Sequence, residues 1–378
     1  MDFSFSDDQD TIRDLAREIL EAEVSLDRVR AAERSADWMD EKLWHTLAEA
    51  KLLGIAIPEA HGGMGMGFAE LCVLLEEVGR VVIAGPWVPT LVLGTLPLAG
   101  FGTDAQQAEW LPRIAAGDAL VTTALLDAGS ADVATPATRG SREGDAVILD
   151  GVKRFVPFAQ RATVMLVPAT TDDGVAVFLV DPLAAGVTTT AQVTSTGQPL
   201  FDVSLAGVRV AASARLGGPD GDGAAILRWL EPRALTALVA MQVGVSDRAL
   251  HLTADYTKER VQFGVPIGSF QAVQHRAADG FIDLETMRWT CWHAAWRLSE
   301  GLPADREAWV AKFWAADSGS RIANASLHLH GGMGADVDYP IQRYFLWSKA
   351  LELDLGGARP TLARLGRDMA RTGPPTAG

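Results

Sequence analysis

Four side chains in one short segment could bind a phosphate-containing ligand: Arg260, Gln262, Phe263 and Gln271. An arginine guanidinium offers a fixed fork of donors for phosphate oxygens, and a glutamine amide offers both a donor and an acceptor. A phenyl ring beside them can pack on a nucleotide. The alternative interpretation is a turn between two helices with a surface arginine, because no single element of the segment is rare.

The surrounding residues predict a rigid corner between two helices. Residues 250–259 have the pattern of a helix end. Gly264 and Pro266 oppose continuation of that helix. Ser269 can cap a second helix that opens at Phe270. The candidate binding residues are therefore expected on the corner between the two.

The period of the hydrophobic pattern changes twice along the chain, which predicts three domains: helical at 1–118, β at 119–222 and helical at 223–378. The helices are expected at 8–32, from Asp40 to about Gly54, at 68–82, from Thr103 or Asp104 to Trp110, and at 224–259, 269–300, 305–329 and 339–370. Antiparallel strands are expected at 146–150, 163–167, 175–180 and 203–210. The predicted fold class is mainly α with a central antiparallel β domain.

Composition excludes several function classes. The chain has 378 residues, 48% of them hydrophobic, and a net charge of −15, which disfavours binding to nucleic acid or to an anionic membrane surface. Cys72 and Cys291 lie inside apolar helical patterns and are expected to be buried thiols, with no metal site. Residues 1–20 are acidic and do not resemble a signal peptide, and no long apolar run is present, so we expect a cytoplasmic protein.

Three segments together resemble the acyl-CoA dehydrogenase superfamily. The segment from Arg260 to Gln271 resembles its R-x-x-F-G-x-x-I-x-x-x-Q signature, and His328 to Gly334 resembles its second signature. The segment Trp110-Leu-Pro112 resembles the family's lead-in to its β domain. The resemblance runs through nearly the whole chain. It implies a helical N-terminal domain, a β-barrel or sandwich and a C-terminal four-helix bundle.

The resemblance also implies FAD as cofactor and an acyl-CoA as substrate. In this family, the phosphate and adenosine half of each FAD is contacted by the neighbouring subunit. The residues here that match those contacts are Arg260, Gln262, Phe263, Gln271, His328, Gly331 and Gly332. His328 is a departure, because relatives usually carry glutamine there.

The carboxylate base of the family is missing at both positions that the resemblance assigns to it. These positions hold Leu355 and Ala234, neither of which can accept a proton. Glu352 and Glu231 lie one helical turn away and are possible substitutes. The alternative is that both are ordinary carboxylates, and Glu231 before Pro232 suits a helix N-terminus. No catalytic residue is therefore assigned.

The flavin-binding strands of the family are also altered. Residues 124–130 read Ala-Leu-Leu-Asp-Ala-Gly-Ser where relatives carry Thr-Glu-Pro-Gly-Ala-Gly-Ser. Residues 155–157 read Phe-Val-Pro in place of Trp-Ile-Thr. Because Pro157 has neither an N–H nor a hydroxyl, both usual donors to the flavin edge are lost at that position.

The combined pattern resembles the non-catalytic subunit of the α2β2 acyl-CoA dehydrogenases with which actinobacteria shorten steroid side chains. The run from Gln342 to Leu346, followed by Lys349 and residues 355–358, looks especially similar. This resemblance implies a homologous catalytic partner that carries the base and the flavin pocket. Two alternatives stay open: a self-sufficient homo-oligomeric acyl-CoA dehydrogenase with a displaced base, and a flavin-free scaffold protein.

Overall fold

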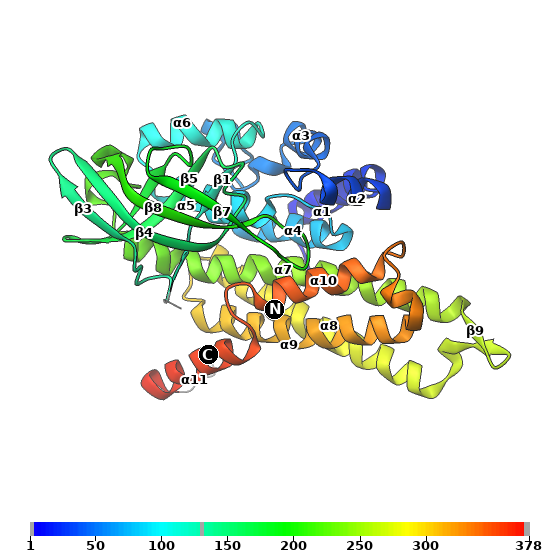
Figure 1. Cartoon of the computed structure of the whole chain (residues 1–378). Helices are drawn as coiled ribbons and strands as arrows, with labels where there is room; N and C mark the ends of the chain where they lie inside the picture. The colour runs from blue at the N-terminus through cyan, green and yellow to red at the C-terminus, as the bar shows by residue number, and fades with distance from the viewer. Residues whose placement is uncertain (1–3, 129–131, 374–378) are drawn as a thin grey trace. The chain divides into compact units, whose positions relative to one another are not determined.

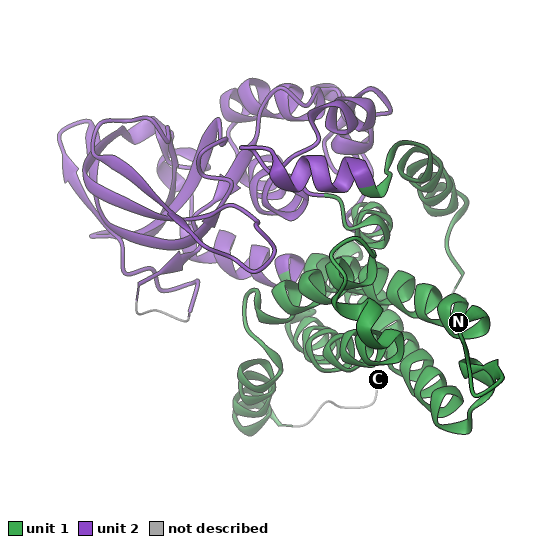
Figure 2. Cartoon of the chain, turned by 45° about the vertical axis from the view of Figure 1, so that its right-hand side comes forward, with its two compact units in different colours: residues 1–26, 71–83, 235–378 green, residues 27–70, 84–234 purple. Residues whose placement is uncertain are grey.

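The computed structural model describes residues 4–128 and 132–373, and the chain divides into two compact units (Figure 2). Unit 1 comprises residues 1–26, 71–83 and 235–378, and unit 2 comprises residues 27–70 and 84–234. Each unit therefore combines segments that are far apart in the sequence.

The first predicted helix is in fact two helices, α1 (Asp7–Glu23) and α2 (Leu26–Arg34). Ser6 caps α1 by accepting a hydrogen bond from the backbone N–H of Gln9, and Ile12, Ala16 and Leu20 form its buried face. Val24 is extended, with φ −98° and ψ 105°, and ends α1. The prediction of one continuous helix over 8–32 is wrong because the hydrophobic period continues across this backbone break.

Two further helices of the N-terminal region begin at the capping residues predicted for them, Asp40 and Thr103. Asp40 accepts a hydrogen bond of 2.9 Å from the backbone N–H of Leu43, and Thr103 caps its helix through Gln106. The elements are α3 (Glu41–Glu49), η1 (Leu52–Gly54), η2 (Glu59–His61), α4 (Phe68–Val81), η3 (Pro89–Gly94), α5 (Thr95–Phe101) and α6 (Asp104–Ala115). The helical segment Pro89–Phe101 was not predicted.

Unit 2 contains an eight-stranded sheet with the order β1-β5-β3-β4-β8-β7, in which β2 also pairs with β4 and β6 with β5. Its strands are β1 (Val121–Thr123), β2 (Leu126–Asp127), β3 (Arg139–Glu143), β4 (Ala146–Pro157), β5 (Val164–Thr171), β6 (Gly174–Val180), β7 (Val187–Gln192) and β8 (Leu200–Ala211). The pairings are antiparallel except β1–β5 and β3–β5, which are parallel. The four predicted strands match β4, β5, β6 and β8.

The core of the sheet contains a buried ion pair. Apolar side chains such as Leu149 and Phe178 form the hydrophobic cluster of the sheet. The Lys153 amine donates a 2.6 Å hydrogen bond to the Asp127 carboxylate. The same carboxylate also accepts a 3.0 Å hydrogen bond from the backbone N–H of Thr138. Burial lowers the pKa of Lys153, and the Asp127 charge opposes that shift. This pair ties β2 to β4.

The C-terminal region is helical as predicted, except that its last helix is divided. The elements are η4 (Ala212–Ala214), η5 (Gly218–Asp220), α7 (Gly223–Glu259), β9 (Val261–Gln262), β10 (Val265–Pro266), η6 (Ile267–Ser269), α8 (Gln271–Ser299), α9 (Asp305–His330), η7 (Gly331–Ala335), α10 (Ile341–Leu353) and α11 (Ala358–Thr372). The prediction of one helix over 339–370 is wrong because Leu355 and Gly356 adopt positive φ values of 50° and 109°. Figure 1 shows α8 and α9 side by side, and α10 and α11 also pack on α9.

Candidate functional site

The predicted corner is a short β-hairpin between α7 and α8, at the tip labelled β9 in Figure 1. Val265 pairs with Gln262 across the hairpin, and Phe263 and Gly264 turn it with φ values of 54° and 82°. Two successive left-handed residues form the tight turn that suits a two-residue hairpin. The backbone N–H of Ile267 then donates a 2.8 Å hydrogen bond to the carbonyl of Arg260. This bond closes the base of the corner.

The start of α8 differs from the prediction. The residue that precedes the helix is Phe270, whose side chain makes no cap. The Ser269 hydroxyl instead donates a 2.7 Å hydrogen bond to the carbonyl of Pro266 inside the 3-10 turn. The prediction that Ser269 caps α8 is wrong because this local bond satisfies its side chain.

The four predicted ligand-binding side chains of the corner are exposed. Phe263 is 93% exposed, and Arg260, Gln262 and Gln271 also face solvent. Within residues 4–128 and 132–373, no partner of the Arg260 guanidinium is found. Arg260 is therefore available to a group outside the described part of the chain.

The second predicted segment is a glycine turn at the C-terminal end of α9. Gly331 has φ 57° and ψ −132°, a conformation that essentially only glycine adopts. Side-chain atoms added at Gly331 or Gly332 would meet nothing within 4 Å. The backbone of the turn therefore lies open to close approach by a ligand.

Two aromatic residues bring the corner and the glycine turn together. The rings of Tyr256, near the end of α7, and His330, at the end of α9, stack with centroids 4.4 Å apart. The Tyr256 hydroxyl also donates to the carbonyl of His330 at 3.4 Å. Burial lowers the pKa of His330, whose Nδ1 lies 2.8 Å from the carbonyl of Ser326. A neutral imidazole donating to Ser326 therefore anchors the turn.

Arg276 adds a second cation beside the glycine turn, and sequence analysis missed it. Its guanidinium donates to Nδ1 of His328 at 2.9 Å, which joins α8 to α9. No local pattern signalled it, because the bond to His328 joins two different helices. Arg260 and Arg276 give this end of unit 1 the donor type that suits phosphate oxygens.

The first base position lies in the link between α10 and α11. Leu355 occupies it with φ 50° and has no group that can accept a proton. Glu352, one of the two possible substitutes, forms an ion pair with Lys349. The carboxylate of this residue is therefore already engaged within its own helix.

The second base position lies inside α7. Ala234 is fully buried. Glu231 and Pro232 lie within the helix, which begins at Gly223. The suggestion that Glu231 marks a helix N-terminus is therefore wrong, because the helix tolerates Pro232 internally.

The two altered strand segments both belong to unit 2. Ala124 is fully buried, and Gly129 and Ser130 lie outside the described residues. Pro157 ends β4, and its carbonyl accepts a 2.7 Å hydrogen bond from the Thr122 hydroxyl. Beyond it, Phe158 is buried, and its ring centroid lies 6.1 Å from that of Trp38. Neither Ala124 nor Pro157 carries a hydroxyl group.

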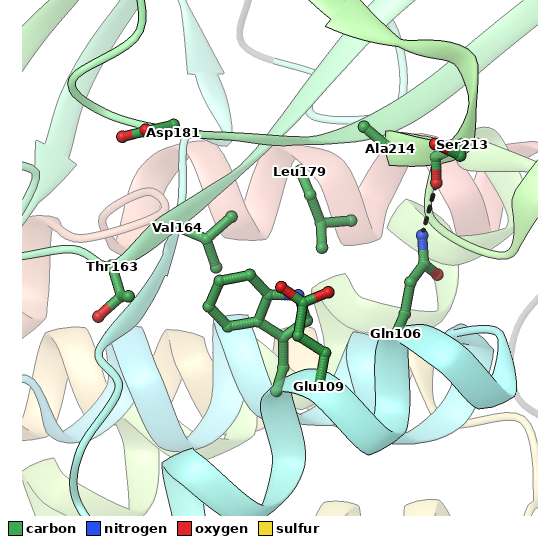
Figure 3. Close-up of a pocket in the computed structure, with 9 residues that line it drawn as sticks. Gln106, Glu109, Thr163, Val164, Leu179, Asp181, Ser213 and Ala214 are labelled. Atoms are coloured by element: carbon green, nitrogen blue, oxygen red, sulfur yellow. Dashed lines mark hydrogen bonds between the residues drawn. The ribbon is translucent and has the colours of Figure 1, made fainter.

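A separate pocket of about 410 Å³ lies in unit 2 (Figure 3). Its lining comprises Gln106, Glu109, Trp110, Thr163, Val164, Leu179, Asp181, Ser213 and Ala214. The Gln106 amide donates a 3.3 Å hydrogen bond to the carbonyl of Ser213 (Figure 3). This donor is therefore used within the protein. The pocket contains none of the predicted binding or base residues.

Two further classes of site are absent from the described residues. No group of three or more histidine, cysteine, aspartate or glutamate side chains there could hold a metal ion. No helix in that part of the chain combines the length and apolar character needed to cross a membrane.

Comparisons with known proteins match this architecture. The family model for the acyl-CoA dehydrogenase N-terminal domain matches residues 6–118, and the model for the acyl-CoA dehydrogenase C-terminal domain matches residues 221–363. The acyl-CoA dehydrogenase FadE27 of Mycobacterium tuberculosis is 36% identical over 98% of this chain and 100% of its own length.

Two solved structures are similar to this chain in sequence and fold over nearly its whole length. The ChsE4–ChsE5 complex from Mycobacterium tuberculosis contains a chain that is 37% identical, with a TM-score of 0.92 and coverage of 100% of both chains. A Tcur3481–Tcur3483 steroid ACAD variant matches at 43% identity and a TM-score of 0.89, over 96% of this chain and 98% of its own. Acyl-CoA dehydrogenases are FAD-dependent oxidoreductases that act on CH–CH bonds. The chain belongs to the acyl-CoA dehydrogenase family.

Proposed function

We propose that this chain is the subunit without a catalytic base in a heteromeric acyl-CoA dehydrogenase. It contributes contacts to the phosphate and adenosine half of an FAD that is seated mainly in a homologous catalytic subunit. The observation that carries the proposal is the exposed Arg260 guanidinium, which has no partner in the described part of its own chain and lies on a rigid corner.

The residues of the corner and the glycine turn fit the phosphate half of FAD. Arg260 and Arg276 supply guanidinium donors, and Gly331 leaves its backbone open to a phosphate oxygen. Phe263 offers an exposed ring for the nucleotide. All of these groups belong to unit 1, where the Tyr256–His330 contact joins α7 to α9 and the Arg276–His328 bond joins α8 to α9.

The strand segments of unit 2 do not fit the ring half of FAD. Ala124 has no hydroxyl, and Pro157 has neither a hydroxyl nor an N–H. The chain therefore keeps the groups that a subunit offers to its partner's flavin and lacks those for a flavin of its own.

The chemistry requires a base that this chain does not present. When bound, FAD accepts the β hydride while a carboxylate removes the α proton of the acyl-CoA. Leu355 and Ala234 occupy the two base positions. The proposal therefore assigns proton removal to the partner and flavin retention to both subunits.

We extend the proposal to the substrate and the assembly. The similar solved proteins include a steroid ACAD and a two-protein complex. We infer a CoA ester of a steroid side chain as the substrate class and two copies of each subunit as the assembly.

Co-expression with an acyl-CoA dehydrogenase homologue that carries the base glutamate tests this function. Light scattering and absorbance should give two copies of each chain and two FAD per assembly, whereas this chain alone should be colourless and inactive. Four FAD per tetramer, or a yellow and active homomer, would support the self-sufficient enzyme. A chain that stays colourless with every homologue would support the scaffold.

A further inference from the structure

The pocket of unit 2 has the size of a small-molecule site and two kinds of wall (Figure 3). Its volume of about 410 Å³ falls within the roughly 300–1,000 Å³ that such sites occupy. Val164 of β5, Leu179 of β6 and the half-buried Trp110 of α6 supply apolar surface. The polar groups come from Gln106, Glu109, Thr163, Asp181 and Ser213. The pocket therefore suits a molecule with one apolar and one polar end.

One polar group of the pocket, the Glu109 carboxylate, is not used within the chain. Glu109 is exposed and extends from α6 into the pocket (Figure 3). Within residues 4–128 and 132–373, its carboxylate has neither a hydrogen bond nor an ion pair. Arg113 lies four positions later on the same helix, the spacing of an intrahelical ion pair. Its guanidinium instead lies over the Trp110 ring, 5.1 Å from the centroid. The Glu109 carboxylate is therefore available to a ligand.

The charges around the pocket favour a cation as the ligand. None of the nine described residues that line it is a lysine, arginine or histidine. Asp181, which follows β6, adds a second carboxylate, one oxygen of which accepts a 2.8 Å hydrogen bond from the backbone N–H of Leu183. The Arg113–Trp110 contact shows that the indole ring accepts a cation on its face. A carboxylate or phosphate ligand would meet like charges in the pocket, whereas an ammonium group would be attracted.

We propose that this pocket binds a small primary amine with an apolar body. The ammonium group donates to the Glu109 carboxylate, and the apolar body packs on Trp110 and Leu179. The Ser213 hydroxyl, which has no partner in the described part of the chain, can accept a second of the three ammonium hydrogens. The site does not rest on the proposed flavin role, because every lining residue belongs to unit 2 and Arg260 belongs to unit 1.

Binding of phenethylamine to the full chain, co-expressed with the homologue that carries the base glutamate, tests the inference. Titration calorimetry should show saturable binding with a dissociation constant of about 1 mM or tighter, the range of a small fragment. Phenethyl alcohol has the same body without the charge and should bind at least about 10-fold more weakly. Phenylacetate carries the opposite charge and should not bind. The chain alone should give the same result, because the pocket lies within one unit.

Two variants locate the bound amine. Glu109→Gln keeps the size of the side chain and removes its charge, so it should weaken amine binding at least about 10-fold. Glu49→Gln is the matched control, because Glu49 is another exposed helical glutamate of unit 2 that does not line the pocket. The affinity of this control for the amine should equal that of the wild type.

Several results would overturn the inference. One is the absence of saturable amine binding by the wild-type protein, and another is phenylacetate binding as tight as that of the amine. Equal affinity of the wild type and Glu109→Gln would show that the amine does not reach this carboxylate. An equal loss in Glu109→Gln and Glu49→Gln would indicate only a general attraction of cations to an acidic chain. Circular dichroism of each variant checks that it is folded.

Discussion

The amine of Lys312 lies 2.6 Å from the carbonyl oxygen of Leu351, inside unit 1. Lys312 is 1% exposed and also lies 3.3 Å from the carbonyl of Glu352. It therefore satisfies backbone acceptors in the last turn of α10, next to the left-handed Leu355. A lysine on α9 thus fixes the end of the helix that leads to Leu355, the first predicted base position.

Stability should depend on pH through Lys312. Burial lowers its pKa from 10.5 to about 8, although Asp354 and Glu352 oppose the shift. Between about pH 8 and 10.5, the unfolded chain holds this proton more tightly than the folded chain, so folding is favoured as the pH rises. The free energy of unfolding, relative to Lys312→Met, should rise by up to about 3 kcal/mol across that range. Urea unfolding of both proteins at several pH values measures it, and a constant difference would contradict the expectation.

The ion pair between Asp127 and Lys153 should be essential to the β sheet. Asp127→Ala leaves a buried ammonium group without its partner, which costs about 3–5 kcal/mol of unfolding free energy. The double variant with Lys153→Met should lose less than the two single variants together, because it removes both charges. A double-mutant cycle by chemical denaturation measures the coupling. Strictly additive losses would show that the pair is not coupled.

The sequence predicted the elements whose ends have strong local signals. Gly264 and Pro266 correctly place a break between α7 and α8. Strands β3 and β7 were missed because their sequences, Arg-Gly-Ser-Arg-Glu and Val-Thr-Thr-Thr-Ala-Gln, lack an apolar alternation. The break at Leu355 was missed although Gly356 and Gly357 follow it and glycine pairs mark turns, because the helical hydrophobic period resumes beyond them.

The candidate site was predictable only as separate segments. Arg260 and Gly331 could be chosen from their own surroundings, but the Tyr256–His330 stack that joins α7 to α9 could not. The Arg276–His328 bond likewise joins two helices, and no local pattern contains it. Tertiary packing therefore supplied what residue spacing could not.

Changing Glu352 should have little effect on turnover. Its carboxylate is paired with Lys349 and is assigned no catalytic role. Glu352→Gln in the co-expressed complex should leave kcat within about twofold, whereas loss of a catalytic base costs about 10²–10⁴-fold. Glu231→Gln is the matched test of the other candidate. A loss of 100-fold or more in either variant would transfer the base to this chain and favour the self-sufficient enzyme.

Removing the Arg260 guanidinium should weaken FAD binding without dissociating the subunits. A charge-assisted bond to the pyrophosphate contributes roughly 1.5–3 kcal/mol, so Arg260→Ala should raise the FAD dissociation constant by about 10- to 150-fold. Lys258→Ala is the control, because Lys258 is an exposed cation near the same helix end that pairs with Asp255. Flavin fluorescence during dilution of the assembled complex measures release, and light scattering checks that the mass is unchanged. Equal retention in both variants would remove Arg260 from the flavin site. An equal loss in both would indicate a general effect of positive charge, because only Arg260 lies on the hairpin corner.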